Sequence, residues 1–367
     1  MARMTRRGLI SAAEGGASLV ANQAVPQDSG SSELRLSPAS RRAIRHRILN
    51  WYRKNKRDLP WRSTRDPYRI WISEIMLQQT RVAAVIPYYQ RFLDRFPDVE
   101  TLRSCEEHDL LAAWAGLGYY SRARNLQKAA NKIVELGEFP REYPTIRSLP
   151  GVGDYTAAAI ASIAFDLPHA VLDGNVIRVL SRLTGEPGNV DSTRVRTRLR
   201  AVADSAIDRR NPGEFNQGLM ELGATVCLPK QPQCSLCPLA RDCRARELGR
   251  QNELPLKSAR PGPIEVEMQL LVIEKADKIL AWKRPGDSRR LAGFWELPEP
   301  AQLPHARMET RIARFRHTIV NTNFSYHVFR ASLLRAPAMF QWLAKDKLHE
   351  FPLSTTTKKA LACLDLG

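Results

Sequence analysis

The stretch that decides the fold is LPGVGDYTAAAI, residues 149–160. Pro150 is expected to end the helix before it, because proline cannot continue a helix. Gly151 and Gly153 permit backbone angles that other residues avoid, and Asp154 can cap the helix that follows. The pattern therefore predicts two helices joined by a tight hairpin. Outward-facing backbone N–H groups at such a hairpin can bind a phosphate, although a plain interhelical turn has the same pattern.

A helical pattern surrounds this hairpin, from about residue 38 to residue 226. Ser121 is a plausible N-cap, and apolar residues keep a 3.6-residue period after it until Gly137. No convincing alternating strand occurs before residue 260. Residues 1–37 begin with arginines but lack the apolar core of a signal peptide, so we expect a disordered extension. We therefore expect a cytoplasmic protein, associated with the nucleoid if its source is bacterial.

The pattern changes after residues 249–263, a polar stretch with Pro and Gly that is typical of an interdomain linker. Two strands are expected around a turn at Ala276–Asp277, and two more around Asn321–Asn323. A final helical stretch runs from about Thr355 to Leu364. The sequence thus predicts a multidomain chain, with an all-α domain joined to a small α+β domain. The predicted parts are the helical domain at 38–226, a cysteine-rich loop at 227–248, the linker, and the α+β domain at 264–367.

The net charge of +18 over 367 residues is too high for a generic metabolic enzyme and indicates a polyanionic partner. No apolar run approaches the roughly 18 residues that span a bilayer. Aromatic residues accompany the basic ones, as at Trp51–Tyr52 and Tyr119–Tyr120, which favours nucleic acid over a membrane surface. The basic stretch 41–62 is either a DNA-binding surface or a solvated helix face.

Four cysteines within 17 residues indicate a metal centre. In a chain without a signal peptide, such clustering is typical of metal binding rather than of disulfides. Zinc usually takes two closely spaced pairs of ligands, and here only one pair is close. An iron–sulfur cluster suits the uneven spacing better, and zinc is the alternative. The expected metal ligands are Cys227, Cys234, Cys237 and Cys243.

Two carboxylates are candidates for chemistry. Glu74 lies among apolar residues in WISEIMLQQT, residues 71–80, where burial would raise its pKa and let it donate a proton. The alternative is a solvated glutamate on a surface helix. Asp173, in LDGNVIRVL (172–180), precedes a helix that it could simply cap, and backbone N–H groups there would keep it ionised. Two carboxylates in such different environments can break a glycosidic bond, and a basic protein would find that bond in DNA.

Together, the hairpin, the LDGNV aspartate and the four-cysteine loop resemble the endonuclease III superfamily of helix-hairpin-helix DNA glycosylases. WISEIMLQQTRV and GLGYYSRARNL resemble its MutY family of adenine DNA glycosylases. The resemblance is dense over residues 39–250 and looser over 264–365. It implies base excision repair of double-stranded DNA, with removal of adenine mispaired with 8-oxoguanine or guanine. We expect the enzyme to act as a monomer.

The resemblance also implies roles for four residues at the reaction centre. Glu74 is similar to the acid that protonates an adenine ring nitrogen, and Asp173 to the carboxylate that stabilises or transiently captures the sugar cation. Tyr155 and Asn175 resemble the partners that position this chemistry. The four cysteines resemble the ligands of a four-iron, four-sulfur (4Fe–4S) cluster.

Further residues are implied to contact DNA. Gln78 and Tyr119 resemble side chains that enter the duplex beside the lesion and fill the gap left by the flipped base. Three arginines beside the cluster loop are expected to meet the DNA backbone: Arg241, Arg244 and Arg246. The implied DNA-binding set is Gln78, Gln79, Tyr119, Gly151, Val152 and Gly153.

One position separates this family from its bifunctional relatives, which place a nucleophilic lysine two residues after GVG. Here that residue is Tyr155, and a phenol cannot form a Schiff base. We therefore expect base excision without efficient strand cleavage.

The domain at 264–367 resembles the MutT-like (Nudix-like) domain that reads 8-oxoguanine, and LAGFWELPE at 291–299 matches it best. It has no Glu-rich pyrophosphatase box, so nucleotide hydrolysis is not expected. It departs from the family at Ile319–Val320–Asn321, where a Phe-Ser-His loop is common. Val320 supplies no hydroxyl, so the preference for 8-oxoguanine over guanine stays open, with Asn321, Thr322 or Asn323 as substitutes.

Two other functions fit part of the sequence. A related glycosylase could remove thymine or uracil from a mismatch, although a separate reader domain argues against it. A non-catalytic iron–sulfur protein would bind DNA without releasing a base, and the joint presence of Glu74 and Asp173 argues against that.

Overall fold

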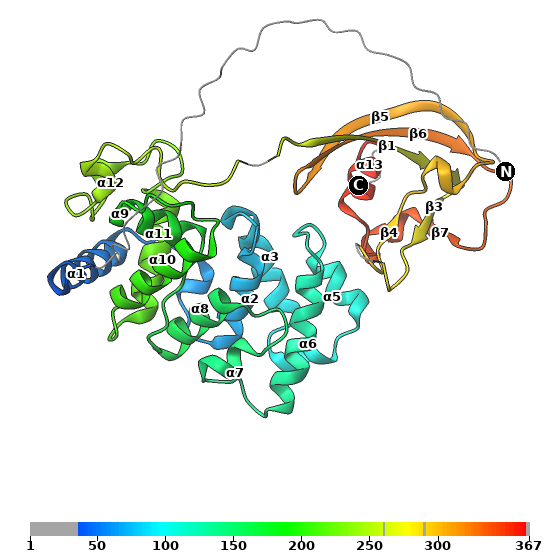
Figure 1. Ribbon diagram of the computed structural model, residues 1–367. Helices are drawn as coiled ribbons and strands as arrows, with labels where there is room; N and C mark the ends of the chain where they lie inside the picture. Colours follow the sequence, from blue (N-terminus) through cyan, green and yellow to red (C-terminus); the bar gives the residue numbers. More distant parts are fainter. Residues whose placement is uncertain (1–35, 260, 289–290, 365–367) are drawn as a thin grey trace, which may run out of the picture. The chain divides into compact units, whose positions relative to one another are not determined.

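The computed structural model describes residues 36–259, 261–288 and 291–364. The extension predicted at residues 1–37 lies almost wholly outside these ranges. Figure 1 shows helices up to α12 and mainly strands after it. None of the helices in the described ranges is long and apolar enough to cross a membrane. The first twelve helices are α1 (Pro38–Asn55), α2 (Pro67–Leu77), α3 (Val82–Arg95), α4 (Val99–Ser104), α5 (Glu107–Trp114), α6 (Ser121–Glu135), α7 (Tyr143–Arg147), α8 (Asp154–Phe165), α9 (Gly174–Thr184), α10 (Thr193–Ala206), α11 (Pro212–Thr225) and α12 (Arg244–Glu247).

Two apolar cores hold these helices together. The first is formed mainly by residues of α2, α3, α5, α6 and α8, and the second by residues of α1, α9, α10 and α11. Helix α2 is apolar on nearly every side, and Trp71, Ile72 and Met76 are fully buried. A helix that is apolar all round belongs inside a domain. The alternative of a solvated surface helix at residues 71–80 is therefore wrong.

Two predicted helix caps differ from the structure by one residue. Tyr120, not Ser121, stands at the N-cap of α6, and Ser121 is the first helical residue. Gly153 stands at the N-cap of α8, and Asp154 is already in its first turn. The Asp154 carboxylate pairs with Arg147 at the end of α7 instead of capping its own helix. An available charged partner outcompetes a backbone N–H here.

The part after residue 264 is α+β, as predicted. It consists of β1 (Ile264–Val272), β2 (Glu274–Lys275), β3 (Lys278–Lys283), β4 (Trp295–Glu296), β5 (Arg307–Ile319), β6 (Thr322–Ser332), β7 (Phe340–Ala344) and α13 (Thr355–Ala362). One sheet has the order β1-β6-β5, and in the other β3 pairs with β2, β4 and β7. Apolar residues of both sheets and of α13 form one core, with Val328, Leu343 and Leu361 among them.

The strand pairing departs from the prediction in two places. The turn at Ala276–Asp277 joins β2 to β3, whereas β1 pairs in parallel with the distant β6. The second turn lies at Val320–Asn321, so Thr322 already belongs to β6. Alternation along one strand shows which faces are buried, but it does not identify the neighbouring strand.

Candidate active site

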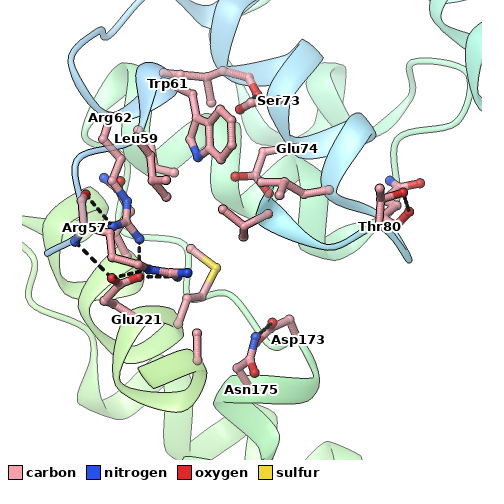
Figure 2. Close-up of a pocket in the computed structure, with 18 of the residues that line it drawn as sticks. Arg57, Leu59, Trp61, Arg62, Ser73, Glu74, Thr80, Asp173, Asn175 and Glu221 are labelled. Atoms are coloured by element: carbon pink, nitrogen blue, oxygen red, sulfur yellow. Dashed lines mark hydrogen bonds and ion pairs between the residues drawn. The ribbon is translucent and has the colours of Figure 1, made fainter. Parts of the chain in front are cut away.

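A cavity of about 480 Å³ is lined by residues of α2, α8, α9 and α11 and by the segment before α2 (Figure 2). This volume is typical of sites for small molecules or single bases. All four predicted catalytic residues line it: Glu74, Asp173, Tyr155 and Asn175. Gln78 and Gln79 line it too, whereas Tyr119 and the hairpin glycines do not.

Glu74 enters the cavity from α2, and its residue surface is only 5% exposed. Burial raises the pKa of this carboxyl to about 7, because a charged carboxylate loses its hydration there. The Tyr155 hydroxyl and Arg62 act in the opposite direction, and the carboxylate of Asp173 adds to the rise in pKa. At neutral pH a group with this pKa holds a proton about half of the time, so Glu74 can serve as an acid.

Tyr155 fixes the orientation of that carboxyl. It lies in the first turn of α8, and its hydroxyl donates a hydrogen bond of 2.7 Å to Oε2 of Glu74. The same hydroxyl lies 3.2 Å from the sulfur of Met220. Burial and the nearby carboxylates raise the pKa of Tyr155 well above its ordinary value. It therefore stays a neutral phenol and a hydrogen-bond donor.

Asp173 lies on the wall opposite Glu74, at the N-cap of α9 (Figure 2). Its Oδ1 accepts the backbone N–H of Val176 at 2.7 Å, and its Oδ2 accepts the side-chain amide of Asn175 at 2.9 Å. Asp173 therefore caps α9, as one of the two predicted roles required, and it also lines the cavity. The positive end of a helix stabilises an anion at this position.

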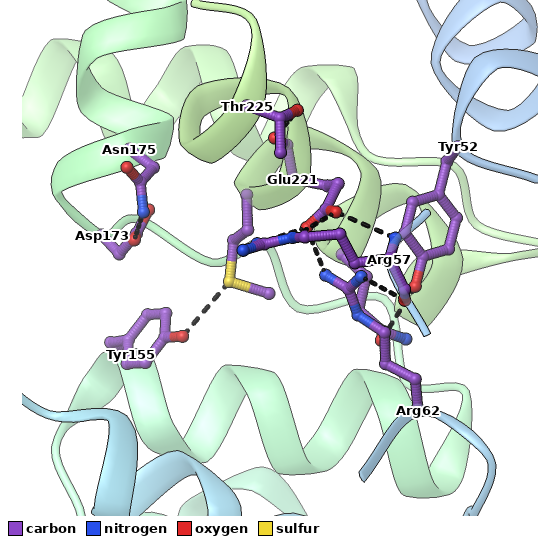
Figure 3. A network of polar contacts seen from close by, with 10 residues as sticks. Tyr52, Arg57, Arg62, Tyr155, Asp173, Asn175, Glu221 and Thr225 are labelled. Carbon is purple, nitrogen blue, oxygen red and sulfur yellow. Dashed lines mark hydrogen bonds and ion pairs between the residues drawn. The ribbon is translucent and has the colours of Figure 1, made fainter. Parts of the chain in front are cut away.

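Glu221 is a cavity residue that the sequence did not reveal. Its side chain is fully buried, and one oxygen accepts the Nε–H of Arg57 at 2.7 Å while the other accepts Nη2–H of Arg62 at 2.6 Å (Figure 3). The backbone N–H of Arg57 donates a further bond at 3.0 Å. Burial by itself would raise the pKa of Glu221, but the bonds from the two arginines lower it to about 2. Its two arginine partners lie 164 and 159 residues away in sequence. The only signal in the sequence was a charged residue placed between the apolar Met220 and Leu222.

Within the basic stretch 41–62, several arginines bind other parts of the protein, and a DNA-binding role of its exposed basic residues stays a prediction. Arg45 donates to the carbonyl oxygens of Ser205 and Ala206 at 2.9 Å each. Arg53 pairs with Glu214, and Arg57 and Arg62 pair with Glu221. These arginines therefore fasten the N-terminal helix region to the distant helices α10 and α11.

The hairpin has the predicted shape, with α7 ending at Arg147 and α8 beginning at Asp154. Gly151 has a φ of 77°, and a Cβ there would come within 2.7 Å of Cβ of Asn125. Val152 differs from the prediction, because its side chain is buried and its N–H donates to the carbonyl of Leu149 at 3.1 Å. The exposed backbone is that of the two glycines, so their N–H groups are the ones left to meet a phosphate.

The four predicted metal ligands line one small second cavity together with Arg182, Arg246 and Gln251. None of them forms a disulfide. Burial and the three neighbouring sulfurs raise the pKa of Cys237 to about 12, so its thiolate needs a positive centre to balance it. Four sulfurs around one cavity fit a cluster with four thiolate ligands. Within the described ranges, no three His, Cys, Asp or Glu side chains meet the geometry for a single metal ion.

Arg178 connects the cysteine loop to the Asp173 side of the cavity. Its Nε donates to the carbonyl of Cys227 at 2.7 Å, and its Nη2 donates to Oδ1 of Asn175 at 2.9 Å. Asn175 in turn donates to Asp173. Gly223 packs so closely on this turn that a Cβ there would lie 2.6 Å from Cβ of Asn175. The cysteine loop and the turn of α9 that carries Asn175 therefore share one set of fixed contacts.

Comparison with known proteins identifies relatives of this chain. Residues 72–204 match the family model described as HhH-GPD superfamily base excision DNA repair protein. The chain is 36% identical to an adenine DNA glycosylase of Mus musculus, over 86% of this chain and 77% of the relative. It is 35% identical to an adenine DNA glycosylase of Homo sapiens, over 86% of this chain and 73% of the relative.

Two solved structures share the helical fold. That of a thermostable thymine-DNA glycosylase aligns with a TM-score of 0.52 and 31% identity, over 57% of this chain and 97% of the other. That of a trapped endonuclease III–DNA covalent intermediate aligns with a TM-score of 0.50 and 24% identity, over 59% of this chain and 99% of the other. The MutT-like character of residues 264–367 stays a prediction.

Proposed function

The chain belongs to the adenine DNA glycosylases, and from this premise we propose that it removes adenine paired with 8-oxoguanine or guanine in double-stranded DNA. It is an enzyme of base excision repair. The observation that carries the proposal is the placement of a protonatable Glu74 and of Asp173, the N-cap residue of α9, in one cavity of base size. We also propose that it works as a monomer in the cytoplasm, associated with the nucleoid if its source is bacterial.

The chemistry follows from these two carboxyl groups. Glu74 gives its proton to a ring nitrogen of adenine, the bond between C1′ of the sugar and N9 of the base breaks, and the bonding electrons leave with neutral adenine. Asp173 stabilises the positive charge that develops on the sugar. Water then adds to C1′, and its proton returns to Glu74. The product is an abasic site in an uncut strand.

The base must leave the DNA stack before it can reach this cavity. Gln78 lies at the end of α2 on the cavity wall, with its side-chain amide 3.3 Å from the hydroxyl of Thr156. Tyr119 is 45% exposed on the loop before α6. We assign these two side chains to the space that the flipped adenine leaves, which offsets part of the unstacking cost of about a few kcal/mol.

The cavity favours base removal without strand cleavage. An amine nucleophile is needed to form a Schiff base with the sugar, and no lysine is among the residues that line the cavity in the described ranges. The position where bifunctional relatives carry lysine holds Tyr155, whose hydroxyl is bonded to Glu74. Breaks at the abasic site should therefore require alkali.

A 4Fe–4S cluster held by Cys227, Cys234, Cys237 and Cys243 is proposed as the cofactor. When bound, it supplies the positive charge that these buried thiolates require. Arg182 supports the site, since its Nη1 lies 3.2 Å from the sulfur of Cys227. Three nearby arginines are proposed to meet the DNA backbone: Arg241, Arg244 and Arg246. Iron and sulfide analysis of the purified protein decides between this cluster and the zinc alternative.

Residues 264–367 are proposed to be a MutT-like domain that reads the base opposite adenine. Val320 is 77% exposed at the tip of the β5–β6 hairpin. The side-chain amide of Asn321 already donates to the carbonyls of Pro261 and Gly262, and that of Asn323 donates to Glu265. The amide nitrogens of Asn321 and Asn323 are engaged in these bonds, whereas Thr322 between them carries a hydroxyl. We therefore propose that the Thr322 hydroxyl is the substitute on which any preference for 8-oxoguanine over guanine depends.

The deciding experiment measures base release from duplexes with adenine opposite 8-oxoguanine, guanine or thymine, and from a thymine–guanine duplex. Wild type and Glu74→Gln are compared, with and without alkali. Adenine release that needs alkali to produce breaks, and that vanishes in the variant, supports the proposal. Release of thymine instead would favour the mismatch glycosylase, and tight binding without release of any base would favour the binding protein.

A further inference from the structure

Arg122 is a buried cation that the reaction chemistry does not use. It lies in the first turn of α6 and is 8% exposed. No carboxylate forms an ion pair with it in the part of the chain that the structure describes. An unpaired buried charge is expensive unless polar atoms of the protein replace its hydration. The polar atoms that surround the Arg122 guanidinium therefore indicate its role.

The guanidinium joins two separate segments. Nη1 donates to the carbonyl oxygens of Ile75 at 2.7 Å, Met76 at 3.0 Å and Gln78 at 2.7 Å, which belong to the last turn of α2 and the turn after it. Nη2 donates to the carbonyls of Leu117 at 2.9 Å and Gly118 at 3.1 Å, and approaches the hydroxyl of Thr80 at 3.3 Å. The guanidinium also lies 5.7 Å from the ring centre of Tyr119.

Both segments carry strained residues next to functional ones. Gln79 has a φ of 58° and Tyr119 a φ of 49°, a region that costs residues other than glycine of order 1 kcal/mol or more. Such conformations persist where surrounding contacts hold them. Arg122 binds the carbonyl immediately before each of them, those of Gln78 and Gly118. It also binds the carbonyl of Ile75, the residue after Glu74.

We propose that Arg122 is a positioning residue that fixes the Gln78–Thr80 turn and the Leu117–Tyr119 loop to each other and to the helix that carries Glu74. The inference rests on the proposed function and deepens it. Gln78 and Tyr119 then enter the duplex in a fixed geometry relative to Glu74. The acid therefore meets the extruded base as these two side chains fill the gap.

The shape of the guanidinium is essential to this role. Arginine presents its N–H groups in a planar fork that reaches both segments, whereas a lysine ammonium is one point that reaches one of them. Arg122→Lys keeps the charge and loses the bridge. A purely structural role predicts lower stability with normal behaviour of the folded protein. The positioning role predicts that the folded variant binds DNA but fails to extrude the base.

The test uses the full chain with Glu74→Gln, so that bound substrate is not consumed, and a duplex with fluorescent 2-aminopurine in place of adenine. Binding of this trapped protein should raise the fluorescence as the base unstacks. Adding Arg122→Lys should abolish most of the rise while DNA affinity changes less than about 10-fold. With Glu74 intact, Arg122→Lys should slow single-turnover adenine release about 100-fold, the scale of a small misplacement.

Arg45→Lys is the matched control, because Arg45 also bonds two distant backbone carbonyls and lies outside the cavity. It should leave the fluorescence rise and the release rate within about 3-fold of wild type. Melting temperatures of both variants show that each is folded under the assay conditions. An unchanged fluorescence rise in Arg122→Lys overturns the inference. Absence of adenine release from the wild type would instead overturn the proposed function.

Discussion

Glu74 and Glu221 line the same cavity, and their acidities are opposite. Both side chains are buried, and burial is the largest influence on each pKa, in the upward direction. Yet the pKa of Glu74 is raised to about 7, whereas that of Glu221 is lowered to about 2. The difference lies in their partners. Glu221 accepts bonds from two guanidinium groups and a backbone N–H, and Glu74 accepts one bond from a neutral phenol.

This contrast shows that burial alone does not make an acid. A carboxylate surrounded by charged donors stays ionised, and one with a single neutral donor takes up a proton. The pair in one cavity is arranged so that one glutamate can give up a proton while the other holds two arginines in place.

The largest expected effect is the loss of catalysis in Glu74→Gln. The amide keeps the size of the carboxylic acid but has no transferable proton, so adenine release should fall about 10²–10⁴-fold. Single-turnover release from an adenine–guanine duplex, with DNA affinity measured in parallel, checks this. If the variant kept a tenth of the wild-type rate, Glu74 would not be the proton donor.

The counterpart, Glu221→Gln, should act on stability first. Removing the carboxylate leaves Arg57 and Arg62 partly buried without their counter-charge, and breaking such a pair costs about 3–5 kcal/mol. Denaturant unfolding at pH 7 measures this loss. Glu74→Gln serves as the control, since it should not reduce stability at that pH. Equal stability of both variants would mean that Glu221 does not stabilise the fold through its two arginines.

The pH dependence of stability separates the same two residues. The folded-state pKa of Glu74 is raised from 4.5 to about 7. Its contribution to the free energy of unfolding is therefore fully present below pH 4.5 and is lost as pH rises through 7. The free energy of unfolding of the wild type should therefore fall by about 3 kcal/mol relative to that of Glu74→Gln across that window. The pKa of Glu221 is lowered, so its contribution is present above pH 4.5 and is lost as pH falls toward 2. Unfolding curves from pH 3 to pH 9 show whether the two windows are opposite.

The release rate should follow the protonated form of Glu74. It should be level below a pKa of about 7 and fall about 10-fold for each pH unit above it. Single-turnover rates between pH 5.5 and pH 9 test this on a duplex that stays bound throughout. A flat profile would show that proton donation by Glu74 does not limit the step.

The smallest effect is expected for Tyr155→Phe. The Tyr155 hydroxyl stabilises the ionised form of Glu74, so its removal should raise the pKa of Glu74 further. The midpoint of the rate profile should move to higher pH by about one unit or less, which is about 1 kcal/mol. A midpoint that moves to lower pH would mean that the phenol favours the protonated acid instead.

Local features of the molecule could be predicted because a few neighbouring residues determine them. The hairpin at 149–160 follows from Pro150 and the two glycines after it, and the cap on α9 follows from Asp173. The spacing of the four cysteines was enough to expect one shared site, and they line one cavity. Alternation and turn residues likewise indicated the α+β part, although not which strands pair.

Glu74 shows the limit of such reasoning. Its apolar neighbours suggested a buried acid, but the same residues fit a surface helix, and only the packing of α3 and α8 against α2 decides between them. The Arg122 bridge is a further case, since its acceptors lie on α2 and on a separate loop.

The sequence by itself indicated the hairpin at 149–160, the Asp173 cap on α9, the shared cysteine site and the two carboxyl groups, because contacts within a few residues set such features. The tertiary structure alone decided that Glu221 stays ionised while Glu74 can hold a proton near pH 7. The pKa of Glu221 depends on two arginines more than 150 residues away, and that of Glu74 on burial by other helices, so no local pattern encodes either value.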